Sequence, residues 1–334
     1  MTDKLRALTI DRYGDINSMT VKELKIPKDI PENFVLIRNE FASLHPADEY
    51  IYMGNFSELR LSHNTLGLNG SGTVIKSGGG VLANSLLNKR VTFMTYGPNN
   101  TGSFANITIV DANCVVPIPD SMNFEQAAGA IYALTIEYMM NKIRKGNHRA
   151  VIQNVACGYI GKAMIKYCTR NGISIINIVR RSNQADLLRE MGCEYVFDSS
   201  EEGWETKVSL LAKTLKATIA FDGVAGEMTG ILYDCLCEPG VLYVYGLLSN
   251  QPCLINPMSL IKEKKIKGLT LFGWLNKLSI LKKTKLVEKV ARLYDQVFFV
   301  NYCATVDINT FKDTLQCYRD RKTNSKILLR TRGI

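Results

Sequence analysis

The segment AVIQNVACGYIGKAMIKYC, residues 150–168, decides the fold class of this 334-residue chain. Its first residues form an apolar run typical of a buried strand, and its last residues place apolar side chains at helical spacing. Between them, Ala156, Gly158 and Gly161 keep the spacing of the three small residues of a dinucleotide-binding turn, with alanine in the first place. Such a turn must be tight, and its backbone must approach a pyrophosphate closely. The segment therefore predicts a strand, a nucleotide-binding turn and a helix.

The helix after this turn is expected to present its N-terminus to a phosphate group. Because the first amides of a helix have no partner within the helix, the N–H groups of Gly158, Tyr159 and Ile160 are expected to bind phosphate oxygens. Asn154 at the end of the strand and Gly161 in the helix flank these amides and are assigned to the same site. The sequence thus predicts a cofactor site built mainly from backbone groups.

The next apolar run, residues 173–180, ends at Arg180 and is followed by Arg181. In a dinucleotide-binding fold this position, about 20 residues beyond the glycine turn, reads the adenosine ribose. An NAD site has a carboxylate there that accepts a hydrogen bond from the 2′-hydroxyl, and arginine cannot accept one. Two guanidinium groups can instead bind a 2′-phosphate. The pair therefore predicts NADPH as the cofactor.

From residue 149 onward, strand-like and helix-like segments alternate, which is the pattern of a doubly wound parallel α/β sheet of the Rossmann type. The expected strands are residues 149–155, 173–180, 193–197, 217–223 and 241–246, and the expected helices are residues 161–171, 183–192, 205–215 and 227–236. Residues 120–143 predict a further helix, with Asp120 or Ser121 as its cap.

The segment before residue 120 predicts a small, mostly β domain. Short strand-like runs are separated there by Gly, Pro, Asn and Asp. These runs are residues 34–44, 71–80, 89–97, 104–111 and 114–119. A helix over residues 308–320 and a strand over residues 325–331 are expected to complete this domain.

The sequence shows no cluster of metal-binding residues. Its three histidines, His45, His63 and His148, are far apart, and none of its nine cysteines forms a C-x-x-C pair. An odd number of cysteines without a secretory signal favours a reducing compartment, so we expect the cytoplasm, or the mitochondrial matrix if a leader was removed. No apolar run is long enough to span a membrane.

The formal net charge of +10 comes largely from two basic runs, residues 262–268 and 275–285. Such runs on helices and loops are usually solvated faces, and this interpretation is favoured over a nucleic-acid surface. We therefore expect a small-molecule substrate and no nucleic-acid partner.

The ordered motifs resemble those of the zinc-free branch of the medium-chain dehydrogenase/reductases, which includes quinone oxidoreductases and 2-enoyl thioester reductases. The resemblance runs over nearly the whole chain and rests on residues 43–56, 66–74, 89–94, 102–112, 116–130, 134–135, 179–200, 221–227 and 240–246. It implies a GroES-like substrate domain over residues 1–122, completed by residues 274–334, and a Rossmann domain over residues 123–273. Gly67-Leu68-Asn69 stands where the zinc enzymes have Gly-His-Glu, and this implies that no metal is used.

The resemblance also implies site residues. In the segment that the family places over the nicotinamide, His45, Asp48 and Tyr50 are the candidate catalytic groups. A tyrosine that enoyl thioester reductases use near the reacting carbon is Phe56 here, which favours another substrate because phenylalanine has no proton to donate. The residues implied on the cofactor side are Thr135 near the nicotinamide, Tyr195 near the adenine, and Tyr245 with Gly246 at the last Rossmann strand.

Three functions follow as hypotheses. The first is an NADPH-dependent reductase of quinones or other conjugated carbonyls, and the second is a 2-enoyl thioester (enoyl-CoA) reductase. The third is a cofactor-binding protein that binds RNA through its basic surface and has little catalytic activity. The apolar runs 241–250 and 266–275 predict a homodimer, because a bare sheet edge would be prone to aggregate.

Overall fold

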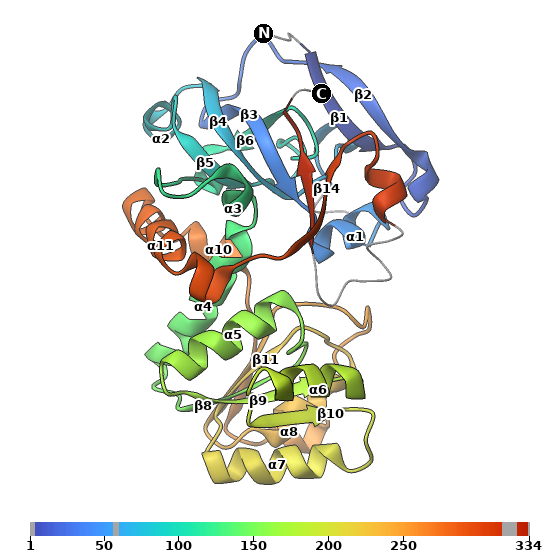
Figure 1. Ribbon diagram of the computed structural model, residues 1–334, viewed down its shortest axis with the longest axis vertical. Helices are drawn as coiled ribbons and strands as arrows, with labels where there is room; N and C mark the ends of the chain where they lie inside the picture. Colours follow the sequence, from blue (N-terminus) through green and yellow to red (C-terminus); the bar gives the residue numbers. More distant parts are fainter. Residues whose placement is uncertain (1–3, 56–59, 316–325, 333–334) are drawn as a thin grey trace. The chain divides into compact units, whose positions relative to one another are not determined.

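The computed structural model describes residues 4–55, 60–315 and 326–332. Its contacts divide the chain into two units, one made of residues 1–134 and 272–334 and the other of residues 135–271 (Figure 1). The first division lies within helix α4 (Ala130–Lys145), later than the expected boundary at residue 122, because helix α3 (Phe124–Ala128) packs on the sheet of the first unit. No helix of the described chain is long and apolar enough to cross a membrane.

The second unit has the doubly wound parallel sheet that the sequence predicts. Its strands, in sheet order, are β10 (Tyr195–Asp198), β9 (Ser174–Val179), β8 (Ala150–Gln153), β11 (Ile219–Asp222), β12 (Gly240–Val244) and β13 (Lys264–Gly268). All their pairings are parallel. The chain starts at β8, runs outward to β10, and then returns to build the other half from β11. The topological switch point, where such sheets bind ligands, therefore lies between β8 and β11.

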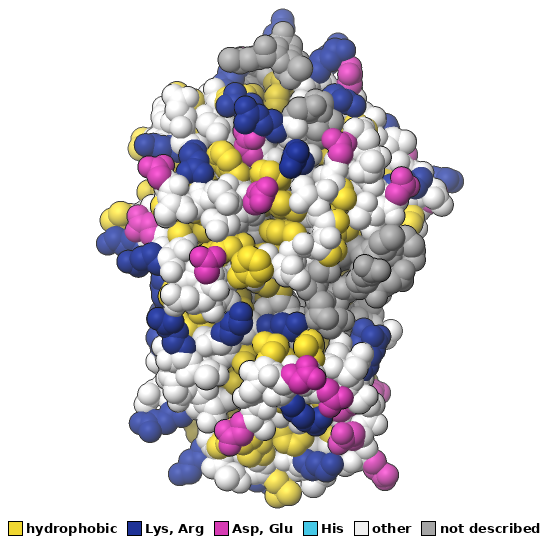
Figure 2. All heavy atoms as spheres, in the orientation of Figure 1, with side chains coloured by type: hydrophobic (Ala, Val, Ile, Leu, Met, Phe, Trp, Pro, Cys, Tyr) yellow, Lys and Arg dark blue, Asp and Glu magenta, His cyan; other side chains and the backbone are white. Residues whose placement is uncertain are grey.

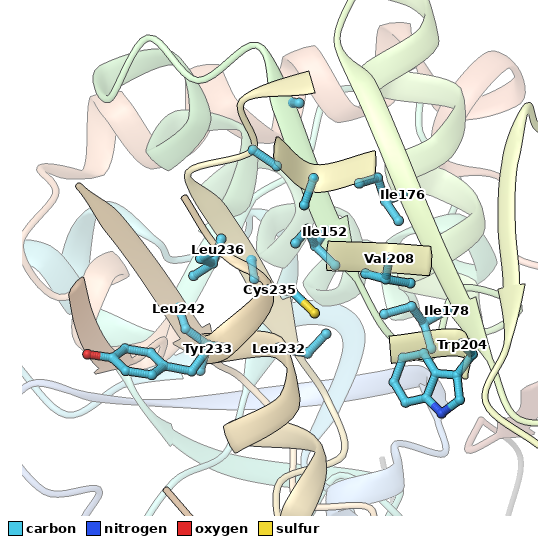
Figure 3. Packing of buried hydrophobic residues seen from close by; sticks show 14 residues of the cluster. Ile152, Ile176, Ile178, Trp204, Val208, Leu232, Tyr233, Cys235, Leu236 and Leu242 are labelled. Atoms are coloured by element: carbon cyan, nitrogen blue, oxygen red, sulfur yellow. The ribbon is translucent and has the colours of Figure 1, made fainter. Parts of the chain in front are cut away.

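Helices cover this sheet where the sequence places them: α5 (Tyr159–Arg170), α6 (Ser182–Glu190), α7 (Trp204–Leu215) and α8 (Glu227–Cys235). Figure 3 shows one of the resulting cores, in which Ile152 and Ile176 from the strands meet Trp204, Val208 and Leu232 from α7 and α8. These side chains are almost completely buried. Burial of apolar area on this scale stabilises the layers by about 25 cal/mol per Å².

The first unit is built on a largely antiparallel sheet. Its order is β14 (Tyr302–Asp307), β15 (Lys326–Arg330), β3 (Phe34–Ser43), β4 (Asn69–Ser77), β5 (Arg90–Met94) and β7 (Val115–Pro117), with β6 (Ile107–Asp111) also paired to β3. Only β14 and β15 are parallel to each other. A separate hairpin joins β1 (Lys4–Ile10) to β2 (Met19–Lys25), and short helices α1 (Pro46–Tyr52) and α2 (Val81–Ser85) connect strands.

Several segments differ from the sequence-based expectation. The helix expected over residues 120–143 is two helices that meet at Gly129, where a side chain would crowd Tyr302 and Val300. The apolar run 266–275 is not one strand, because β13 ends at Gly268 and helix α10 (Leu271–Leu275) follows.

Several elements were not expected, and one expected helix is seen only in part. The hairpin of β1 and β2 and the basic helix α11 (Ile280–Arg292) were not expected as elements. Of the helix expected over residues 308–320, residues 308–310 form a turn, residues 311–315 are helical, and residues 316–320 lie outside the described residues.

Candidate functional site

The predicted nucleotide turn joins β8 to α5 at the carboxyl edge of the parallel sheet. Gly161 lies so close to the strand that an added Cβ would stand 2.6 Å from the Cα and carbonyl carbon of Ala156. Both are buried, so neither can move aside easily. Gly158 caps the helix and has no side chain to satisfy its first amides. These are the features that a pyrophosphate-binding turn requires.

The N–H of Gly158, however, donates to the carbonyl oxygen of Val155 at 2.9 Å. This hydrogen bond closes the turn, so the expected phosphate donors are the amides of α5 from Tyr159 and Ile160 onward. Val155 itself has φ of 53°, a left-handed conformation that a β-branched residue rarely adopts. The turn is therefore held by its surroundings and not by the preference of its own residues.

Arg180 and Arg181 stand at the carboxyl end of β9, on the same edge of the sheet as the turn. Both side chains are exposed, and among the described residues no carboxylate forms an ion pair with either. Arg181 is the N-cap of α6, and the backbone N–H of Arg180 donates to the Gln184 side chain at 3.3 Å. Two unpaired guanidinium groups beside a helix N-terminus can bind a phosphate monoester.

Asp222 organises the switch point between β8 and β11. It is fully buried, and one of its carboxylate oxygens accepts hydrogen bonds from the Asn154 amide at 2.6 Å and from the N–H groups of Val224 and Ala225. The other oxygen accepts the hydroxyl of Thr229 at 2.6 Å. These bonds fix the loop after β11, so Asn154, which was assigned to the cofactor, has its amide committed to the protein frame.

Tyr245 and Gly246 continue the same edge. The backbone N–H of Tyr245 donates to the carbonyl of Asp222 at 2.8 Å, and a Cβ on Gly223 would stand 2.8 Å from the Tyr245 hydroxyl. A Cβ on Gly246 would stand 2.6 Å from the Gly223 carbonyl oxygen, so both glycines are needed for this close approach. Burial, with a smaller effect of the Asp222 carboxylate, raises the pKa of the Tyr245 phenol. The group is a neutral hydroxyl.

Tyr195 does not lie at this edge, which argues against its assignment to the adenine. It begins β10 and pairs with Ile176, which is four residues before Arg180 along β9. At about 3.3 Å per residue this places it more than 10 Å from the carboxyl edge. Thr135 lies in α4 and is half-buried, and its place beside the nicotinamide stays a prediction.

In the first unit, His45 and Asp48 form the N-terminal cap of helix α1. The Asp48 carboxylate accepts the backbone N–H of His45 at 2.7 Å, and Nδ1 of His45 accepts the N–H of Ala47 at 2.9 Å. Burial, and next the nearby Lys326 ammonium, lower the pKa of His45 to about 3. An imidazole that is neutral and accepts at Nδ1 carries its proton on Nε2. His45 is therefore a hydrogen-bond donor and not an acid.

Tyr50 is two residues after Asp48 and so points about 200° away from it around the helix. Its side chain is half-buried, and burial, followed by the charge of Glu49, raises the pKa of its phenol. Tyr52 is buried in the core of this unit and is not available to replace the tyrosine missing at position 56. Phe56 itself lies outside the described residues.

Among residues 4–55, 60–315 and 326–332, no group of three His, Cys, Asp or Glu side chains is placed to hold a metal ion. In the segment that stands for Gly-His-Glu, Asn69 is buried and donates to the carbonyl of Ala128 at 2.8 Å. Leu68 is buried as well. This donor set does not suit zinc.

Sequence reasoning missed the polar groups that hold the edge together. Asp222 follows an apolar strand and precedes a glycine. This pattern indicates the end of a strand, but it gives no sign of the buried hydrogen bonds that Asp222 accepts. Gln153 and Asn177 are a second example: their side chains are 2.8 Å apart across β8 and β9, and Gln153 also donates to the carbonyl of Gly161 at 3.1 Å. Each reads as an ordinary polar residue until the strands are paired.

The sequence is similar to those of known dehydrogenases and reductases. A family model described as zinc-binding dehydrogenase matches residues 160–292. The mitochondrial enoyl-[acyl-carrier-protein] reductase of Arabidopsis thaliana is 24% identical over 283 residues, which are 83% of this chain and 74% of that protein. A quinone oxidoreductase of Pseudomonas aeruginosa is 25% identical over 234 residues, 69% of this chain and 70% of that protein.

Solved structures show the same fold. The Escherichia coli quinone oxidoreductase complexed with NADPH has a TM-score of 0.80 at 19% identity, covering 98% of this chain and 99% of that one. A 2-haloacrylate reductase has a TM-score of 0.83 at 18% identity, covering 98% and 100%. The fold of this chain is therefore shared with each of these two structures over nearly its whole length.

The contact between Gly161 and Ala156 yields a first prediction. Gly161→Ala should lower the free energy of unfolding by about 1–3 kcal/mol, because the added methyl group has no space, and it should weaken dinucleotide binding. Urea denaturation and NADPH titration measure the two effects. Gly268→Ala is the matched control, since an added Cβ there meets nothing within 4 Å, and it should change stability by less than about 0.5 kcal/mol. Equal behaviour of the two variants would show that the close approach is not required.

Proposed function

Because this chain belongs to the medium-chain dehydrogenase/reductase family, we propose that it is an NADPH-dependent reductase that transfers hydride to a quinone or another conjugated carbonyl without a metal. The observation that carries the proposal is the carboxyl edge of the parallel sheet. There a tight turn with no room for a side chain at Gly161 lies on the same edge as two exposed arginines, Arg180 and Arg181, with which no carboxylate of the described residues pairs.

The residues present fit an NADPH molecule. The amides at the start of α5 would bind the pyrophosphate, and Arg180 with Arg181 would bind the 2′-phosphate. When bound, NADPH supplies the hydride. The relative from Escherichia coli, whose structure was determined with NADPH, supports this cofactor choice.

The chain's own contribution to the chemistry is hydrogen bonding to the acceptor. A conjugated acceptor that receives hydride develops negative charge on a distant oxygen, and one or two donors can stabilise it. In the first unit His45 offers a fixed Nε2–H, and Tyr50 offers a phenol that is protonated at neutral pH. Asp48, which the sequence grouped with them, serves the helix cap instead. We propose His45 and Tyr50 as the catalytic pair.

Two other functions are kept as alternatives. Relatives named as mitochondrial enoyl-[acyl-carrier-protein] reductases, from several organisms, support a 2-enoyl thioester as substrate and the mitochondrial matrix as an alternative to the cytoplasm. RNA binding through a basic surface has less support, because Figure 2 shows lysine and arginine side chains interspersed with acidic ones on the face in view.

Cofactor choice is the second prediction. NADPH should bind much more tightly than NADH, and Arg180→Ala with Arg181→Ala should remove most of the difference. Each charge-assisted bond lost should cost about 1.5–3 kcal/mol. Arg149→Ala is the control, because Arg149 is exposed and precedes β8 at the opposite edge of the sheet. Equal affinity of the unmodified protein for both cofactors would contradict the proposal.

Substrate class is the third prediction. NADPH absorbance should fall faster with quinones and small enones than with crotonyl-type thioesters, and Phe56→Tyr should raise thioester turnover selectively.

Tyr50→Phe should reduce turnover by about one to two orders of magnitude with little change in NADPH affinity. Tyr195→Phe, which removes a phenol away from the carboxyl edge, should leave turnover unchanged. A natural preference for enoyl thioesters would replace the first function by its alternative.

Assembly is the fourth prediction. Strand β13 is an edge strand, and four apolar side chains in it or shortly before it are exposed: Met258 at 68%, Leu260 at 57%, Ile261 at 78% and Ile266 at 37%. We propose that a second copy of the chain covers this edge in a homodimer. Ile261→Glu should shift the sedimentation coefficient to that of a monomer. A natural protein that is monomeric at all concentrations would rule the homodimer out.

A further inference from the structure

The register of strand β15 brings a lysine to the N-terminus of helix α1. Leu328 pairs with Ser43 at the end of β3, and the N–H of Leu44 donates to the carbonyl of Ile327 at 3.0 Å. The residue before Ile327, at the start of β15, is Lys326. Its backbone N–H donates to the carbonyl of Asn301 at 2.9 Å. The backbone of this lysine is therefore fixed on both sides, alongside the helix cap.

The ammonium group of Lys326 is buried against an aromatic ring. The residue is 9% exposed, and its Nζ lies 4.9 Å from the ring centroid of Tyr132. The same ring stacks on His45, with centroids 5.2 Å apart and planes 9° from parallel, and its hydroxyl donates to the carbonyl of Leu44 at 2.7 Å. Within the described chain no carboxylate lies within ion-pair distance of Nζ. Lys283, another buried lysine of this unit, instead donates to the carbonyl of Asn113 at 2.6 Å.

Asp48 is the carboxylate whose charge acts on Lys326. One of its carboxylate oxygens accepts the N–H of His45, and the other is buried without a hydrogen-bond partner. Among the described residues, the groups that act on this carboxylate are the backbone amides of His45 and Leu68 and the ammonium of Lys326. The neutral imidazole of His45 and the ring of Tyr132 belong to the same cluster.

Each buried charge depends on the other. Burial raises the pKa of Asp48 to about 7, and the two amides and the Lys326 ammonium oppose that rise. Burial lowers the pKa of Lys326 to about 8, and the Asp48 carboxylate opposes that fall. A buried charge that loses its counter-charge becomes neutral, because desolvation then acts without compensation.

We propose that Lys326 is a positioning residue, which keeps Asp48 a carboxylate and thereby keeps the first turn of α1 closed around His45. The carboxylate holds the backbone N–H of His45, and the closed turn keeps Nδ1 of the imidazole on the N–H of Ala47. The only proton the ring can then donate is the one on Nε2. The part of this proposal that concerns catalysis rests on the proposed reductase function, in which His45 donates a hydrogen bond. The effect of Lys326 on the charge of Asp48 does not depend on that function.

The experiment compares the natural full-length protein with three variants. Lys326→Met removes the charge and keeps an unbranched side chain, Lys326→Arg keeps the charge, and Lys283→Met removes another buried lysine as the matched control. The first measurement is a carbon-13 titration of the aspartate carboxyl groups, with the Asp48 signal assigned through Asp48→Asn. The second is the pH profile of kcat/KM for NADPH oxidation with a quinone or enone.

In the natural protein we expect Asp48 to titrate near neutral pH, far above an ordinary aspartate. Lys326→Met should raise its midpoint by about one pH unit or more, since loss of a nearby opposite charge removes a stabilisation of the carboxylate. Lys326→Arg and Lys283→Met should stay within about half a unit of the natural value. The acid limb of kcat/KM should move with the Asp48 midpoint, because protonation releases the cap.

An Asp48 that titrates near 4 in the natural protein, or a midpoint that Lys326→Met leaves unchanged, would overturn the proposal. If Lys326→Met does not fold, the titration of the natural protein and of Lys326→Arg still tests the proposal. Arginine keeps the positive charge, so a strongly shifted Asp48 midpoint in Lys326→Arg would contradict the claim that this charge keeps Asp48 ionised. An acid limb that stays in place while the Asp48 midpoint moves would refute the positioning role. Absence of NADPH oxidation with every acceptor refutes the reductase function alone, because the titration needs no turnover.

Discussion

The cofactor half of this protein depends on one close contact, the packing of α5 against β8 where Gly161 meets Ala156. A Cβ at Gly161 would overlap the backbone of the turn, so the helix can begin beside the strand only with glycine there. That approach aims the N-terminus of α5 at the carboxyl edge of the sheet. It also leaves Gly161 within reach of Gln153, whose side chain donates to the glycine carbonyl at 3.1 Å.

Around this contact the protein uses buried polar groups to hold a strained edge. Val155 and Ala225 both have positive φ, and neither residue favours that conformation. Asp222 helps to hold this edge, since its carboxyl group accepts three hydrogen bonds from the loops that follow β8 and β11 and a fourth from Thr229 in α8. Removing one of these donors would leave a buried polar atom with fewer hydrogen bonds, which destabilises the fold.

The first unit also contains buried charged groups, but these two groups do not form an ion pair. Asp48 and Lys326 are both buried, yet they lie beyond ion-pair distance and act on each other through the protein interior, where the effective dielectric constant is low. Burial and the Lys326 ammonium lower the pKa of His45, and its Nδ1 accepts the N–H of Ala47 in the helix cap. The chemistry available to this unit is therefore hydrogen-bond donation, in keeping with an acceptor that spreads its own charge.

The sequence alone determined the doubly wound sheet, the nucleotide turn and the place of Arg180 and Arg181, because each follows from local spacing: alternating periodicity, three small residues, and a strand end. It did not determine which polar residues meet. Tyr195 looked like an adenine neighbour until the register of β10 placed it at the other end of the strand. The sequence analysis did not single out Lys326, which the pairing of β15 with β3 brings to the helix cap. Such pairs are set by long-range register, which no local pattern encodes, so only the tertiary structure decided where these side chains act.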